Sequence, residues 1–457
     1  MTKPVHFGTD GVRGVANEGM LAPERVLALG RALGRLARRD GAEGPVALAR
    51  DPRRSSPMIA AGLAAGLASE GVEVLDLGVL PTPGLAVLLE GLGASLGAMV
   101  SASHNPMRDN GIKVLLADGG KLADDDELWL EAELDRPPAS PAPTGAGVGD
   151  VRRVDAAVDR YVDVLAARFD GLSLEGMRIV VDAANGATSE AAPRILERLG
   201  ADVALRFASP DGLNINDGCG AVHPEAMARD VVAEGADVGV AFDGDGDRLM
   251  LASADGSVQD GDRVLYVCGR ERLAGGTLKD GVLVGTVMSN FGLELAMRAL
   301  GGRLHRTPVG DRHVAAALRE HGWGLGGEPS GHVIFGAEHG FVGDGLYSAL
   351  SVLAVIARTG TPMHELSRDL KAVPQVLLNV PVREKPPLDE QPALAGRIEE
   401  AEAALAGEGR VLVRYSGTEN LLRVMVEGTD DTIVRSEAEA IADVVRGTLG
   451  ADAPATS

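Results

Sequence analysis

Residues 96–106 read LGAMVSASHNP, in which five apolar residues lead directly into a polar hexapeptide. The apolar run, 96–100, has the length and composition of a buried strand. Upstream, the short β-branched runs 46–49 and 72–75 flank an alanine- and leucine-rich segment, 58–69, that has the composition of a helix. This alternation predicts an α/β architecture, in which loops at the ends of the strands present the functional groups.

The same alternation begins again further along the chain. A segment rich in Pro, Gly and Ala, 137–149, follows the first pattern and predicts a domain boundary. The later strands and helices are expected at 178–182, 189–199, 201–206, 238–242, 249–252, 282–287, 291–300, 411–413, 422–427 and 433–449. We therefore expect three similar α/β domains and a smaller α+β domain, with the limits 1–149, 150–253, 254–371 and 372–457.

Composition excludes several classes of partner. The chain has 457 residues, a formal net charge of −22 and 3% aromatic residues. Such an acidic chain repels nucleic-acid backbones and anionic membranes, so neither is an expected partner. The two cysteines, Cys219 and Cys268, form no C-x-x-C motif, and the first residues include no apolar signal segment. A reducing cytoplasm fits these features.

Residues 243–248, Asp-Gly-Asp-Gly-Asp-Arg, are the strongest metal signal. Their glycines let the backbone curl so that three carboxylates converge on one cation. Hard oxygen ligands favour Mg²⁺, Ca²⁺ or Mn²⁺ over zinc. An EF-hand is excluded, because Arg248 and Ala254 stand where it needs Gly and Glu. An ordinary Asp-Gly turn is the alternative, but three acids in one turn repel each other unless a cation is present.

The hexapeptide 101–106, Ser-Ala-Ser-His-Asn-Pro, places Ser103 and His104 at a strand end. A hydrolase nucleophile elbow would need G-x-S-x-G, which is absent here. The alternative is a serine-rich turn that caps the next helix. Lys113, shortly downstream, could balance a phosphoryl group or act as an acid or base, although a lysine alone is more often a surface residue.

Two further loops combine polar groups in useful ways. Residues 327–332, Gly-Glu-Pro-Ser-Gly-His, offer a carboxylate, a hydroxyl and an imidazole, which suit sugar hydroxyls. Residues 414–419, Arg-Tyr-Ser-Gly-Thr-Glu, have the chemistry of a phosphate cradle. A plain turn and a hairpin turn, respectively, are the alternatives. No Walker A motif occurs, so ATP hydrolysis is not indicated.

Together and in this order, these segments resemble the α-D-phosphohexomutases, and within that family its bacterial glucosamine branch, over nearly the whole chain. The resemblance implies four domains around a central cleft, three α/β and a C-terminal α+β. It implies the interconversion of glucosamine 6-phosphate and glucosamine 1-phosphate, with a sugar 1,6-bisphosphate as intermediate and activator. It also implies one Mg²⁺ per active site and a monomer or homodimer. Glucose and mannose phosphates are the alternative substrates.

The resemblance also assigns roles to individual positions. Ser103 corresponds to the phosphoserine, and the implied metal ligands are Ser103, Asp243, Asp245 and Asp247. The implied catalytic residues are Ser103, His104, Lys113, Arg13 and Arg248. The implied substrate-binding residues are Glu328, Ser330, His332, Asp311, Arg312, Arg414, Ser416, Gly417, Thr418 and Arg423. Pro329, Tyr415 and Asn420 depart from the usual glucosamine pattern, whereas the Ser-Gly-Thr-Glu core at 416–419 favours that branch.

Overall fold

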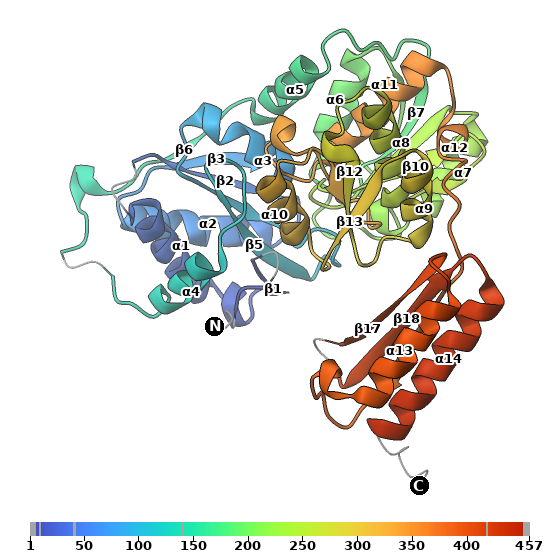
Figure 1. Cartoon of the computed structure of the whole chain (residues 1–457). Coiled ribbons are helices and arrows are strands. Elements are labelled where there is room, and N and C mark those ends of the chain that lie inside the picture. Colours follow the sequence, from blue (N-terminus) through green and yellow to red (C-terminus); the bar gives the residue numbers. More distant parts are fainter. Residues whose placement is uncertain (1–5, 9–10, 40–42, 139–140, 417–418, 451–457) are drawn as a thin grey trace. The chain divides into compact units, whose positions relative to one another are not determined.

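The structure is a computed structural model that describes residues 6–8, 11–39, 43–138, 141–416 and 419–450. Figure 1 shows the whole chain. Its contacts divide it into two compact units. The first unit combines Met1–Thr286 with His305–Ser367, and the second combines Val287–Leu304 with Arg368–Ser457. Each unit is described by itself.

The first sheet has the strand order β1-β5-β4-β2-β3-β6. Its strands are β1 (Val12–Val15), β2 (Val46–Arg50), β3 (Val74–Val79), β4 (Leu96–Val100), β5 (Asp109–Leu116) and β6 (Val151–Arg153). β2 runs parallel to β3 and β4, whereas β5 runs antiparallel to β4 and β1. All five residues of β4 are buried, as expected for an inner strand covered on both faces. β6 follows the segment 137–149, where a domain boundary is predicted, and pairs with β3 in the first sheet. The four predicted domain limits stay predictions.

Helices pack against this sheet. They are α1 (Pro23–Ala37), α2 (Ser56–Ser69), α3 (Thr82–Leu88) and α4 (Asp124–Glu133). Figure 1 shows α1 and α2 side by side, and their apolar residues share one core cluster with β2, β4 and β5. The predicted helix at 58–69 is confirmed and begins two residues earlier, where Pro57 suits a first turn.

The second and third sheets repeat this layered arrangement. The second has the order β11-β10-β9-β7-β8 and the third the order β13-β12-β14-β15. Their strands are β7 (Arg178–Asp182), β8 (Asp202–Arg206), β9 (Val238–Phe242), β10 (Leu249–Ser253), β11 (Val258–Gln259), β12 (Val282–Thr286), β13 (Arg303–Thr307), β14 (Gly326–Gly327) and β15 (Val333–Ile334). The accompanying helices are α5 (Ala157–Arg168), α6 (Thr188–Arg198), α7 (Glu225–Glu234), α8 (Gly261–Ala274), α10 (Asp311–His321), α11 (Gly345–Thr359) and α12 (Met363–Leu366), whereas α9 (Phe291–Ala299) belongs to the second unit.

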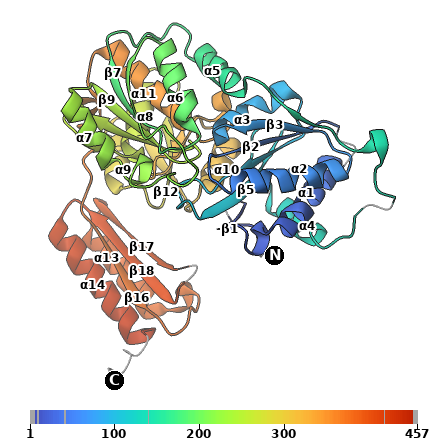
Figure 2. The same cartoon turned by 180° about the vertical axis from the view of Figure 1, so that it is seen from behind.

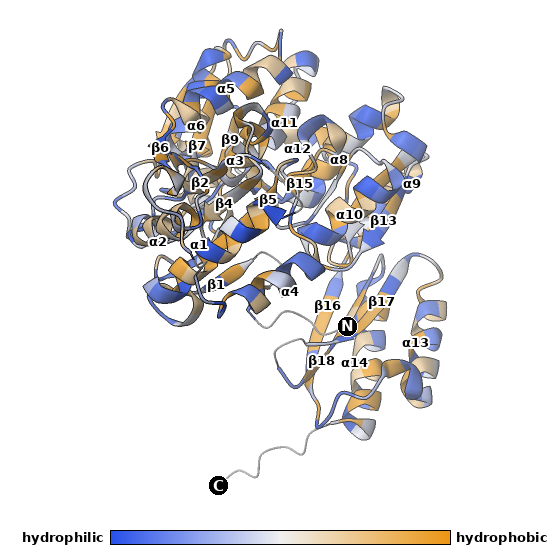
Figure 3. Ribbon diagram, turned by 90° about the vertical axis from the view of Figure 1, so that its left-hand side faces the viewer, coloured by the Kyte–Doolittle hydropathy of each residue, from blue (hydrophilic) through white to orange (hydrophobic). Residues whose placement is uncertain are grey.

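The last sheet is antiparallel, with the order β16-β18-β17. It consists of β16 (Gln375–Pro381), β17 (Gly409–Tyr415) and β18 (Leu421–Gly428), accompanied by α13 (Pro392–Ala404) and α14 (Asp431–Thr448). Figure 2 shows both helices along one face of this sheet, and Figure 3 shows that its strands are mostly hydrophobic. The prediction of α/β domains followed by a C-terminal α+β domain is confirmed. Among the described residues, no helix is long and apolar enough to cross a membrane.

The close approach of α1 and α2 depends on two glycines that face each other. A Cβ at Gly66 would lie 2.5 Å from the carbonyl oxygen of Leu27 and 2.7 Å from the Cα of Gly30. Both neighbours are backbone atoms, so the helices would have to separate to accept a methyl group.

We expect Gly66→Ala to destabilise the protein by about 1–3 kcal/mol, because overpacking outweighs the roughly 1 kcal/mol gain in helix propensity. The shift of the urea or thermal unfolding transition measures this. Gly396→Ala in α13 is the control, because a Cβ there meets no described atom within 4 Å. A Gly66→Ala protein as stable as the control variant would contradict the packing argument.

Candidate active site

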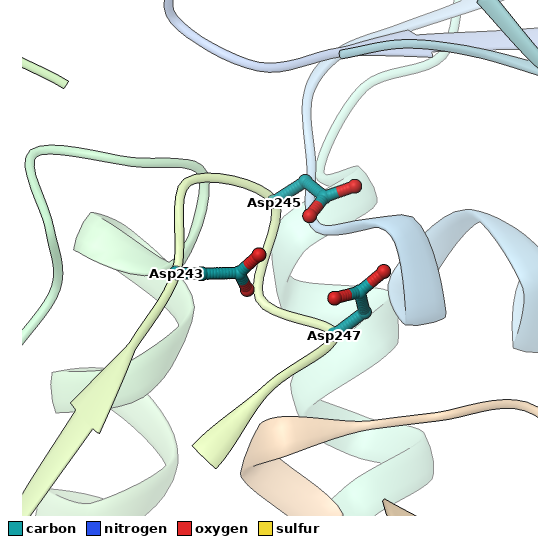
Figure 4. Close-up of side chains that lie close together, drawn as sticks. All are labelled: Asp243, Asp245 and Asp247. Atoms are coloured by element: carbon teal, nitrogen blue, oxygen red, sulfur yellow. The ribbon is translucent and has the colours of Figure 1, made fainter. Parts of the chain in front are cut away.

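Three carboxylates meet in the turn between β9 and β10. The antiparallel register pairs Phe242 with Leu249, so residues 243–248 form the connecting turn. Figure 4 shows the side chains of Asp243, Asp245 and Asp247 directed toward one another. One oxygen of each lies within 4.8 Å of the others, and all three residues are buried.

Glycines make this turn possible. Gly246 adopts a φ of +75°, in the left-handed region that suits a residue without a side chain. A Cβ at Gly244 would lie 2.7 Å from the carbonyl oxygen of Ser103. The carboxylate turn, 243–248, and the serine loop, 101–106, therefore approach each other through backbone atoms.

The turn concentrates negative charge away from water. Burial, followed by the charges of Asp247 and Asp245, raises the pKa of Asp243 to about 8. Burial also acts to raise the pKa of Asp247, but Lys113 and His332 outweigh it and hold that pKa well below its usual value. Lys113 Nζ lies 2.7 Å from Asp245 Oδ2 and 2.9 Å from Asp247 Oδ2. One lysine thus balances part of the charge of three acids.

The donor set fits a hard divalent cation. Asp245 Oδ1 is buried and accepts no hydrogen bond from the residues that the structure describes. A buried carboxylate oxygen without a donor is costly, and a cation would satisfy it. The carboxylates of Asp243, Asp245 and Asp247, with an oxygen on Ser103, would supply the all-oxygen ligands that Mg²⁺ prefers.

Ser103 lies at the end of β4, as predicted, and its side chain reaches the carboxylate turn. The residue is 1% exposed, and its Oγ donates a hydrogen bond to Asp243 Oδ2 at 2.5 Å. His104 Nδ1 lies 3.4 Å from the same Oγ. Burial and the cations Arg248 and Arg13 lower the pKa of His104 to about 4, so its imidazole is neutral at pH 7.

The predicted basic residues lie around this serine. Arg13 on β1 stands opposite Gly111 of β5, and Lys113 follows two residues later on β5. Arg248 Nε lies 3.9 Å from Asp247 Oδ1. These cations are the local counter-charge that an anionic substrate would need in a chain of net charge −22.

The loop after β14 places His332 beside the carboxylate turn. His332 Nδ1 lies 3.6 Å from Asp247 Oδ1, and its Nε2 lies 3.4 Å from Asp311 Oδ2. Burial alone would lower the pKa of His332, but these two carboxylates outweigh it and raise the pKa to about 9. Glu328 accepts hydrogen bonds from Gly310 N at 3.0 Å and from Ser330 Oγ at 3.4 Å.

A cavity of about 290 Å³ opens next to this histidine, and its lining includes Lys113, Asp247, Asp311, Arg312 and His332. The Arg312 side chain contacts the acidic helix α4. Its Nη1 donates to Asp124 at 2.8 Å and its Nη2 to Glu127 at 2.9 Å. Asp311 and Arg312 thus line the same cavity as His332, and the Arg312 guanidinium is already bound to two carboxylates.

The predicted phosphate-binding residues lie on the last sheet, in the second unit. Arg414 of β17 and Arg423 of β18 are directly paired in the antiparallel register. Two like charges opposite each other destabilise a sheet, and an anion would relieve the repulsion. Ser416 is buried at the end of β17, and the predicted residues Gly417 and Thr418 lie outside the described residues.

Sequence reasoning missed several residues that hold the site. Thr82 Oγ1 donates to Asp245 Oδ2 at 2.5 Å, and Asn216 Nδ2 donates to the carbonyl of Ser103 at 2.9 Å. The buried ion pair of Asp51 and Arg53 supports the serine loop, because Arg53 Nη2 donates to the carbonyl of Ser103. The available signal was the polar run 50–56, which follows a buried strand just as the serine loop does.

Comparison with known proteins finds four domains of one family along the chain. Family models match domain I at residues 4–139, domain II at 159–256, domain III at 260–373 and the C-terminal domain at 377–444 of phosphoglucomutase/phosphomannomutase. A phosphoglucosamine mutase of Symbiobacterium thermophilum is 49% identical over 448 residues, which cover 98% of this chain and 100% of that protein. The chain belongs to the phosphoglucomutase/phosphomannomutase family.

Other family members extend this relationship. A phosphoglucosamine mutase of Anaeromyxobacter sp. is 47% identical over 451 residues, which cover 97% of this chain and 96% of that protein. The crystal structure of a family protein from Burkholderia thailandensis has a TM-score of 0.80 and 26% identity, with 98% of each chain covered. An Aspergillus fumigatus N-acetylphosphoglucosamine mutase, solved with GlcNAc-6P and magnesium, shares the fold with a TM-score of 0.64. The match has 19% identity and covers 97% of this chain and 96% of that chain. The phosphohexomutase resemblance and the four-domain fold are therefore confirmed.

For this phosphohexomutase we expect Mg²⁺ to stabilise the protein through the carboxylate turn. At about 100 times its Kd, a bound ion adds roughly 2.7 kcal/mol to the free energy of unfolding. Asp243→Asn should lose most of this gain. Without Mg²⁺ the variant should be about as stable as the parent, because burial and the neighbouring acids already keep Asp243 largely uncharged at pH 7 when no cation is bound. Thermal unfolding with and without Mg²⁺ measures both effects.

Asp255→Asn is the matched control for this measurement, because Asp255 is an exposed acid in the turn after β10. It should keep the full response to Mg²⁺. An equal response in the Asp243→Asn protein would show that the ion binds elsewhere.

Proposed function

We propose that this phosphohexomutase interconverts glucosamine 6-phosphate and glucosamine 1-phosphate through phosphorylated Ser103. The observation that carries the proposal is the hydrogen bond from Ser103 Oγ to Asp243, inside a turn of three buried carboxylates. The activity follows the phosphoglucosamine mutases that are 44–49% identical over nearly the whole chain. The chain is thus an isomerase of amino sugar phosphates.

The reaction begins with the phosphoryl group on Ser103. An oxygen of the bound sugar phosphate attacks the phosphorus, the new sugar O–P bond forms, and the bond from phosphorus to Ser103 Oγ breaks. The proton of the attacking hydroxyl passes to a nearby base, for which neutral His104 is the candidate, while the Lys113 ammonium beside Asp245 and Asp247 balances negative charge. The product of this half-reaction is a sugar 1,6-bisphosphate and an unmodified serine.

The second half reverses the first from the other end of the sugar. The bisphosphate turns round, Ser103 Oγ attacks the other phosphorus, and the serine is phosphorylated again while the isomeric monophosphate leaves. One Mg²⁺ on Asp243, Asp245 and Asp247, when bound, supplies positive charge that offsets the charge on the transferring group. Arg13 and Arg248 add to that offset from the protein.

The remaining loops select and hold the substrate. Glu328 and Ser330 are proposed to bind sugar hydroxyl or amino groups, with His332, Asp311 and Arg312 beside them. A set of residues on the last domain is proposed to bind the phosphate that does not react: Arg414, Ser416, Gly417, Thr418 and Arg423. Paired arginines recognise a phosphate group and not the sugar ring that carries it. They therefore suit a site that must accept either end of the substrate.

Three further features remain predictions under this proposal. They are the cytoplasmic location, the monomeric or homodimeric state, and the domain limits 1–149, 150–253, 254–371 and 372–457. Glucose or mannose phosphates are the second candidate substrates. Pro329, Tyr415 and Asn420, which depart from the usual glucosamine pattern, support that candidate.

We expect intact-protein mass spectrometry to find a fraction with one phosphoryl group, located by peptide mapping at Ser103. Ser103→Ala should lose this group and all measurable turnover while keeping the fold, since the hydroxyl is the carrier. Ser95→Ala, at the opposite end of β4, is the matched control and should keep both. Full turnover by the Ser103→Ala protein would remove the basis of the mechanism.

For sugar preference, we expect kcat/KM for glucosamine 1-phosphate to exceed that for glucose 1-phosphate by at least about tenfold. The reason is that an ammonium group at C2 can pair with the Glu328 carboxylate, which a neutral hydroxyl does less strongly. Glu328→Gln keeps the shape and removes the charge, so it should reduce the ratio between the two sugars. Similar kcat/KM values for both sugars in the parent protein would favour the second candidate.

A further inference from the structure

Arg53 is a completely buried arginine that lies beneath the serine loop. All five of its N–H donors have acceptors, which is the full capacity of a guanidinium. Nε donates to Asp51 Oδ2 at 2.8 Å. The other four donate to backbone carbonyls of the serine loop and its continuation, those of Ser103, Asn105, Pro106 and Asp109. One side chain therefore binds four carbonyl groups within seven residues of chain.

Asp51 reaches the other side of the same serine. Its Oδ2 accepts a hydrogen bond from Ser101 Oγ at 2.7 Å, and Ser101 Oγ in turn accepts from the backbone N–H of Ser103 at 2.9 Å. Asp51 itself is completely buried and accepts a further bond from Ser56 Oγ at 2.7 Å. Asp51 thus holds the N–H of Ser103 through Ser101, and Arg53 binds the carbonyl of Ser103 directly.

Ser103 needs such support because of its backbone conformation. Its φ is +53°, in the left-handed region that non-glycine residues rarely occupy. Conformations of this kind persist only where the surroundings over-determine them. In this backbone conformation Ser103 Oγ donates its hydrogen bond to Asp243 Oδ2.

A second side chain, from the segment between β8 and β9, donates hydrogen bonds to the same loop. Asn216 Nδ2 donates to the carbonyls of Ser103 at 2.9 Å and Asn105 at 3.2 Å. These are the two carbonyls that also accept from Arg53 Nη2. The loop that carries the serine is therefore fixed by hydrogen bonds to its backbone from two sides, while the serine side chain keeps its contact with the carboxylate turn.

We propose that Arg53, paired with Asp51, is a positioning residue for phosphoryl transfer: it holds the Ser103 backbone so that Oγ keeps its place at the carboxylate turn in both halves of the reaction. The inference rests on the proposed function, because the position of Oγ matters most when a group must be given and retaken in line. Within the part of the chain that the structure describes, the Arg53 side chain donates to Asp51 and to backbone carbonyls and not to the side chain of Ser103 or to the carboxylate turn, so its effect is on geometry. A displacement of about 1 Å at a reacting atom can cost about 10²-fold in rate.

The test compares two arginine-to-lysine variants. Lysine keeps the charge that Asp51 requires but offers three donors in place of five and cannot span the four carbonyls. Arg53→Lys should lower kcat by about 10²-fold and change KM by less than about twofold. Arg35→Lys is the matched control, because Arg35 is a largely buried arginine of α1 that pairs with Glu70 and Glu133 away from the serine loop. It should leave kcat within about twofold of the parent.

A second variant covers the case in which Arg53→Lys does not fold. Ser101→Ala leaves the Asp51–Arg53 pair intact and removes only the link to the N–H of Ser103. It should also lower kcat by about tenfold or more at unchanged KM. A folded Arg53→Lys protein with parental kcat would overturn the proposal, and if that variant is unfolded, parental kcat in Ser101→Ala would overturn it.

A readout without substrate separates this inference from the proposed function. Amide hydrogen exchange of residues 101–106 should be faster in Arg53→Lys than in the parent, and unchanged in Arg35→Lys. A parent protein that lacks mutase activity but shows this exchange pattern would defeat the proposed function and leave the positioning role intact. Parental exchange rates in Arg53→Lys would defeat the positioning role even in an active enzyme.

Discussion

The constraint that organises this protein is the burial of three carboxylates in one turn of six residues. Charges this close and this far from water are strongly unfavourable unless they are compensated. Part of the compensation comes from distant parts of the chain, Lys113 from the first sheet and His332 from the third, and Arg248 adds to it from the turn itself. The parts of the first unit meet at this turn because each supplies charge or hydrogen bonds that the acids require. A divalent cation would complete the same compensation.

Much of the fold could be predicted because buried inner strands are continuous apolar runs. The strands at 96–100, 178–182 and 238–242 coincide with β4, β7 and β9 for that reason. The β5 strand was missed, because its sequence begins Asp-Asn-Gly and mixes polar with apolar residues. The short edge strand β6 was missed because its three residues are exposed and polar enough to read as loop.

The candidate site likewise contains residues that could be predicted from the sequence and residues that could not. Ser103 and the three aspartates could be predicted, since hydroxyls and carboxylates clustered beside glycines at strand ends leave a local pattern. The role of Arg53 could not, because its acceptors are backbone carbonyls, which any sequence offers. The direction of Arg312 could not be predicted either, because its partners Asp124 and Glu127 lie more than 180 residues away. Such contacts depend on the packing of helices and leave no motif.

The bond between Ser103 and Asp243 joins residues 140 positions apart in the chain. During synthesis the serine loop leaves the ribosome long before the carboxylates that will face it. Because contacts of such large sequence separation form late, the first domain can be folded while the active site is still incomplete. Under the proposed function, Ser103 therefore gains the surroundings for phosphoryl transfer only when the second sheet has docked, which makes that docking a necessary step toward an active enzyme.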